Sequence, residues 1–178
     1  ILQKLQAIMR RDWKLLLRQL LLTQKPLCLQ PVKKMAIDRK EVIEQCFAAG
    51  VKRMAEIACE VNEWAPALKL SAEYEGAIFP VCGVHPDYAS TLNSQTLKDL
   101  ENYLLKPEVK ALGEIGLDYN EYEGCPKDRE MQKYAFDVQL KLAAKLNMPI
   151  VLHCRKSRAA DDFSAYEDMF SILKNNIY

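Results

Sequence analysis

The amino-acid sequence predicts an α/β fold with parallel strands. Four short apolar segments alternate with segments whose apolar residues recur every three or four positions. This alternation is typical of strands joined by crossover helices, which bury both faces of the sheet. A second observation agrees with it, because polar residues stand at the carboxyl ends of the apolar segments, where parallel α/β folds bind their ligands.

The regular pattern starts with a predicted helix from Asp38, its N-cap, to Gly50, which ends it. The predicted strands and the other helices then alternate along the chain. Strands are expected within residues 51–61, 77–84, 109–117 and 148–154, and helices within 62–76, 94–105, 127–147 and 161–176.

Residues 1–37 are expected to form a separate segment, followed by a domain over residues 38–178. Residues 1–40 contain ten Lys or Arg and only two Asp, whereas the rest of the chain has an excess of acidic residues. Apolar residues from Leu2 to Leu20 follow a helical stripe, so a basic amphipathic helix is predicted. Three roles stay open for it: a surface helix without chemical consequence, a targeting presequence, and a contact with nucleic acid.

Composition excludes several classes of protein. The six cysteines include no CxxC pair and no regular spacing, which argues against a disulfide framework or a structural zinc cluster and favours reduced, intracellular thiols. No apolar run approaches the roughly 20 residues that a membrane span needs, so no membrane partner is expected. We therefore expect a cytoplasmic protein, with the nucleus or the mitochondrion as other possible compartments.

Three residues with metal-binding or acid–base chemistry stand at the ends of three successive strands: His85, Glu114 and His153. Each alone is compatible with a hydrogen-bonded structural residue. Together they predict a metal or acid–base site, because a buried carboxylate is costly unless a metal, a cation or several donors meet it. Such a site would lose its metal as His153 protonates, near its ordinary pKa of about 6.5.

Three motifs carry a family resemblance: GVHPDYA at 83–89, ALGEIGLDYN at 111–120 and MPIVLHCRKS at 148–157. They resemble signature blocks of the TatD family of metal-dependent deoxyribonucleases. The resemblance implies a (β/α) TIM-barrel of the metallo-dependent hydrolase type that hydrolyses DNA phosphodiesters at two divalent metals. By the same resemblance Glu114 bridges the metals, His153 ligates one of them, and His85 contacts the substrate. Arg155 lies two residues after His153, a position from which its guanidinium is expected to hold the scissile phosphate. Mg²⁺, Mn²⁺ and Zn²⁺ all stay open as the metal.

The sequence also departs from the family pattern. That pattern includes an H-x-H pair on the first strand and a later histidine and aspartate, none of which this sequence supplies. About four of the eight βα units of a barrel are expected, so we predict an incomplete chain with impaired or no catalysis and with self-association through open barrel edges. Two alternatives remain: a non-catalytic fragment that serves as a binding or oligomerisation module, and another amidohydrolase-like phosphoesterase.

Overall fold

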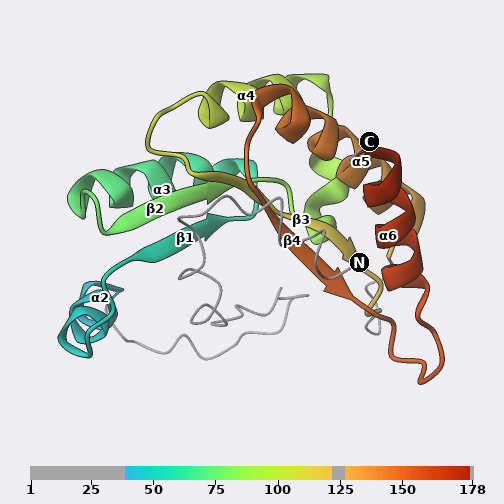
Figure 1. Ribbon diagram of the computed structural model, residues 1–178, viewed down its shortest axis with the longest axis horizontal. Coiled ribbons are helices and arrows are strands. Elements are labelled where there is room, and N and C mark those ends of the chain that lie inside the picture. Colours follow the sequence, from blue (N-terminus) through green and yellow to red (C-terminus); the bar gives the residue numbers. More distant parts are fainter. Residues whose placement is uncertain (1–38, 122–126, 177–178) are drawn as a thin grey trace. The chain divides into compact units, whose positions relative to one another are not determined.

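The computed structural model describes residues 39–121 and 127–176 (Figure 1). The basic helix predicted within residues 1–37 and the N-cap Asp38 lie outside the described residues. The described part of the chain divides into two units between Ala55 and Glu56. The elements are, in order, α2 Arg39–Ala48, β1 Met54–Ala58, α3 Val61–Glu73, β2 Ile78–Cys82, the 3₁₀ helix η2 Pro86–Thr91, α4 Ser94–Leu104, β3 Ala111–Asp118, α5 Arg129–Leu146, β4 Ile150–Arg155 and α6 Ser164–Asn176.

The strands form one four-stranded sheet in the order β1-β2-β3-β4. Strands β2 and β3 run parallel with Val81 opposite Ala111, and β3 and β4 run parallel with Gly116 opposite His153. The Gly83 N–H donates to the Ala58 carbonyl at 3.2 Å next to the end of β2. The predicted parallel α/β fold with four barrel strands is therefore confirmed, and among the described strands β4 is an edge.

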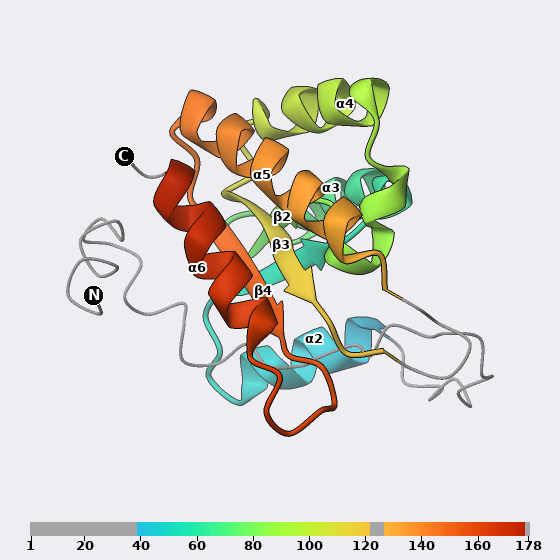
Figure 2. The same ribbon diagram turned by 90° about the vertical axis from the view of Figure 1, so that its right-hand side faces the viewer.

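Helices of the second unit pack against this sheet and bury its core. Helix α3 packs on β2, α5 packs on β3, and α6 packs on β4; Figure 2 shows α5 and α6 crossing the viewer's side of the sheet. The core contains the fully buried Trp64, Leu112, Ile115, Leu117 and Phe136. Such burial contributes roughly 1.5–3 kcal/mol for each large apolar side chain.

Local signals explain where the helices around the site begin and end. Helix α5 begins after Asp128, whose carboxylate accepts from the Met131 N–H, and it ends at Asn147, which has a left-handed backbone with φ of 51°. The 3₁₀ helix η2 was not predicted; it begins with Pro86 directly after His85. No helix in the described ranges is long and apolar enough to cross a membrane.

Candidate metal site at the strand ends

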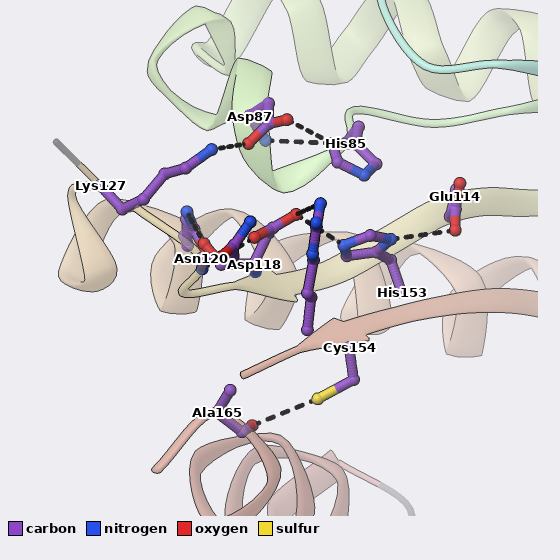
Figure 3. Close-up of polar contacts among 11 residues, drawn as sticks. His85, Asp87, Glu114, Asp118, Asn120, Lys127, His153, Cys154 and Ala165 are labelled. Carbon is purple, nitrogen blue, oxygen red and sulfur yellow. Dashed lines mark hydrogen bonds and ion pairs between the residues drawn. The ribbon is translucent and has the colours of Figure 1, made fainter. Parts of the chain in front are cut away.

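Glu114 of β3 and His153 of β4 lie side by side at neighbouring strands. The Nδ1 atom of His153 is 3.1 Å from the Oε1 atom of Glu114 (Figure 3). Both side chains are partly buried, and the parallel pairing of β3 with β4 places them together. The structure thus brings together the carboxylate and the imidazole that the sequence motifs single out.

Asp118, which the sequence analysis did not select, completes the surroundings of His153. Its Oδ2 atom lies 3.0 Å from the His153 Nε2 atom, so a carboxylate faces each nitrogen of the imidazole. Asp118 is 1% exposed, and its Oδ1 atom accepts from the Asn120 N–H at 2.9 Å. A signal for it was present in the sequence, because Asp118 follows Glu114 by four residues in one strand, and even spacing places side chains on one face.

The two carboxylates determine the charge of this imidazole. Burial opposes protonation of His153, but the hydrogen bonds to Asp118 and Glu114 outweigh it and raise the pKa of His153 to about 9. The hydrogen bond from His153 lowers the pKa of Glu114 against the effect of burial. Burial would raise the pKa of Asp118, yet the hydrogen bonds from His153 and from the Asn120 backbone lower it. Without a metal, His153 is therefore a cation between two anions at neutral pH.

His85 approaches the same site from the end of β2. Its ring centroid is 4.4 Å from that of His153, in an edge-on arrangement. The Asp87 N–H donates to the His85 Nδ1 atom at 3.1 Å, so Nδ1 is an acceptor and the proton of the neutral ring is on Nε2. Figure 3 shows that second nitrogen pointing toward His153. Burial and the charge of His153 lower the pKa of His85 to about 4, which keeps the ring neutral.

Two basic side chains approach the same region. Arg155, at the end of β4, has its Nη1 atom 4.0 Å from Asp118 Oδ2, and 43% of its side chain is exposed. Lys127 forms a buried ion pair with Asp87, the residue whose backbone holds His85. The rim of the site therefore combines acidic groups with two cations, of which Arg155 is open to solvent.

Gly116 lets β3 and β4 approach closely beside the site. A Cβ atom at Gly116 would lie 2.0 Å from the His153 carbonyl oxygen, and the residue has a φ of 144°. Both the contact and the backbone conformation require glycine.

The residues present fit a divalent metal. Ligand atoms of His85, Glu114 and His153 all lie within 4.8 Å of one another. The 3.1 Å between His153 Nδ1 and Glu114 Oε1 is close to the roughly 3.3 Å that separates two tetrahedral zinc ligands. Asp118 on the other nitrogen matches the common arrangement in which a metal-bound histidine donates its second N–H to a carboxylate. His85 fits less well as a ligand, because its acceptor nitrogen is already occupied by the Asp87 N–H.

Comparison with known proteins identifies the family. A family model described as TatD related DNase matches residues 28–177. The chain belongs to the TatD-related DNase family. The resemblance indicated by the three motifs is thereby confirmed. Because the match to the TatD family begins at residue 28, it includes part of the segment that the sequence analysis separates at residue 37, and that boundary stays a prediction.

Curated TatD relatives are similar over most of the chain. The 3′-5′ ssDNA/RNA exonuclease TatD of Pantoea vagans is 40% identical over 124 residues, which cover 70% of this chain and 46% of the relative. The protein of the same name from Erwinia tasmaniensis is 37% identical over 139 residues, which cover 78% of this chain and 49% of the relative. The chain therefore spans about half the length of the curated relatives that it matches.

Solved structures agree with the fold. YjjV, a TatD homologue from Escherichia coli K12, aligns with a TM-score of 0.62 and 26% identity over 79% of this chain and 52% of its own. An uncharacterised amidohydrolase from Saccharomyces cerevisiae aligns with a TM-score of 0.61 and 24% identity over 78% of this chain and 44% of its own. The yeast structure supports the fold alone.

Proposed function

We propose that this chain carries part of the site of a TatD-type nuclease, in which Glu114 and His153 hold a divalent metal that acts on a phosphodiester of single-stranded DNA or RNA. The observation that carries the proposal is the placement of the His153 imidazole between Glu114 and Asp118. A carboxylate and an imidazole supply one set of ligand atoms, and the second carboxylate fixes the orientation of the ring. The names of the curated relatives supply the substrate class.

The side chains have distinct tasks in this proposal. A bound divalent metal would polarise the phosphoryl oxygen and lower the pKa of a coordinated water. Asp118 accepts from His153 Nε2 and thereby leaves the Nδ1 lone pair for the metal. His85 presents its Nε2–H as a donor to a phosphate oxygen. Arg155, the solvent-exposed cation, holds the phosphate with its planar fork of N–H groups.

The donor set favours one class of metal. Imidazole together with carboxylate suits Zn²⁺ or Mn²⁺ better than Mg²⁺, which prefers an all-oxygen octahedral shell. We therefore propose a metal of the Zn²⁺ or Mn²⁺ type.

Hydrolysis of a labelled single-stranded oligonucleotide tests the proposal. With Mn²⁺ present, we expect the 178-residue chain to cleave at least about a hundredfold more slowly than a relative of full length, because even loss of groups around the metal ligands costs 10 to 100-fold. Residual cleavage should disappear on chelation and in Glu114→Ala and His153→Ala, whereas the exposed Lys141→Ala serves as the control. Metal-dependent cleavage that both site variants retain would contradict the assignment of the site.

A second candidate function, self-association, is favoured by the exposed apolar surface around the edge strand. Leu152 of β4 is 38% exposed, and Phe163, Tyr166 and Phe170 at or in α6 are 52%, 38% and 56% exposed. Positions 163, 166 and 170 repeat at three and four residues, so they share one face of the helical segment. An edge strand beside an apolar face is a site for pairing with a second copy.

A further inference from the structure

Two glutamines of α5 each form hydrogen bonds with the main chain near the end of a strand. Gln132 accepts from the Asp118 N–H at 2.8 Å and donates to the Asp118 carbonyl at 2.9 Å. Gln139 accepts from the Val84 N–H at 2.8 Å and donates to the Val84 carbonyl at 3.0 Å, and its amide also donates to the Ala135 carbonyl at 3.0 Å. Both glutamines are at most 2% exposed.

These contacts replace strand pairing where the sheet opens. Strands β2 and β3 are paired at Val81–Ala111 and Cys82–Leu112, and Val84 and Asp118 lie beyond those pairs. On its other side Asp118 is still paired with Arg155 of β4. A buried backbone N–H and C=O need partners, and the amide of glutamine offers one acceptor and one donor, as a neighbouring strand would. Each glutamine side chain thus supplies the acceptor and the donor that a residue of a neighbouring strand would otherwise supply to the backbone.

Both glutamines lie on one face of α5. Gln132 and Gln139 are seven residues apart, which is close to two turns, so they lie on the same face of α5 about 10 Å apart. The two residues whose backbones they contact are next to, or part of, the site. Val84 precedes His85, and the carboxylate of Asp118 faces His153 Nε2. Contacts of α5 with both β3 and η2 agree with this role.

We infer that Gln132 and Gln139 are positioning residues that fix His85 and the Asp118–His153 pair in their places at the proposed metal site. Gln139 acts through the backbone of Val84, and Gln132 acts through the backbone of Asp118. The catalytic meaning of the inference rests on the proposed function, but the positioning itself does not require a bound metal.

NMR of the histidine side chains tests the inference, because the chain has only two histidines and their ring signals are easily separated. The variants are Gln132→Met and Gln139→Met, which keep length and volume but remove the amide. Leu140→Met is the matched control, since Leu140 is also buried on α5 and contributes no polar group. We expect Gln139→Met to shift the ring signals of His85 most, and Gln132→Met those of His153, while the control leaves both unchanged.

Binding of Zn²⁺ alone gives a second readout. Gln132→Met should weaken it by about tenfold, the lower end of the loss seen when groups that orient a metal ligand are removed. If the glutamine variants melt at lower temperature but keep the ring signals and Zn²⁺ affinity of Leu140→Met, their role is structural only and the inference is wrong. A wild-type chain that binds no Zn²⁺ would instead contradict the proposed function, and the ring signals would still decide the inference.

Two further measurements cover the case in which a methionine variant does not fold. Gln132→Asn and Gln139→Asn keep a buried amide that is one methylene too short to reach the strand, so the same ring shifts are expected from them. In the wild type, the side-chain NH₂ protons of both glutamines should exchange slowly with solvent. Rapid exchange of those protons would overturn the inference without any variant.

Discussion

At the scale of single residues, the site depends on how His153 is charged. An imidazole between Glu114 and Asp118 is a stable cation, so a metal must displace a proton to bind Nδ1. From the sequence, loss of metal is expected near the ordinary pKa of His153. The two carboxylates raise that pKa to about 9, so competition between proton and metal is expected over a higher pH range.

The first prediction concerns this charge. In Asp118→Asn the hydrogen bond to a neutral amide no longer favours the imidazolium, so the pKa of His153 should fall from about 9 toward the ordinary value near 6.5. The pH dependence of the His153 ring signals measures it, with Asp137→Asn on the surface of α5 as the control. A His153 pKa equal in the two variants would show that Asp118 does not stabilise the cation.

The second prediction follows from the same competition. Because folded His153 is protonated below a pKa of about 9, the apparent affinity for Zn²⁺ should fall about tenfold for each unit of pH below that value. Calorimetry in buffers of different ionisation enthalpy should also detect about one proton released for each ion bound near pH 7. Affinity that is constant from pH 9 to 7 would exclude Nδ1 of His153 as the displaced group.

Among the strands and helices, the close approach of β3 and β4 brings Glu114 and His153 together. The third prediction is that Gly116→Ala destabilises the fold by about 3 kcal/mol or more, since overpacking adds to backbone strain. Gly76→Ala is the control, because Gly76 has a φ of 75° but open space around it, so only strain of about 1–2 kcal/mol is expected. Equal losses in denaturant unfolding would mean that strand approach is not the constraint.

The sequence could predict the elements better than their contacts. Apolar periodicity was enough to predict the four strands and the helices between them, and the motifs singled out His85, Glu114 and His153. The expectation that Glu114 ends its strand was wrong, because Glu114 is the fourth of the eight residues of β3. Asp118 was missed because it looks like a residue just past the strand, whereas β3 extends to it. Gln132 and Gln139 were beyond prediction, because a buried glutamine on a helix has no periodic signature and its partners lie 14 and 55 residues away.

At the scale of the whole molecule, the described sheet ends at β4 and leaves an apolar face beside it. The fourth prediction is that Phe170→Ser reduces self-association while changing stability little, because Phe170 is 56% exposed. Light scattering over a range of concentrations measures it. Leu105→Ser is the control, since Leu105 is 64% exposed at the end of α4. Equal effects of the two substitutions would show that the α6 face is not the contact.

We propose that Glu114 and His153, and not His85, hold a divalent metal in this member of the TatD family. Isothermal titration of Zn²⁺ or Mn²⁺ into the wild type, Glu114→Ala, His153→Ala and His85→Ala tests it most directly. We expect the first two substitutions to weaken binding by at least about tenfold and His85→Ala to leave it unchanged within a few-fold. Binding that survives the loss of Glu114 and His153, or that is lost with His85 alone, would contradict it.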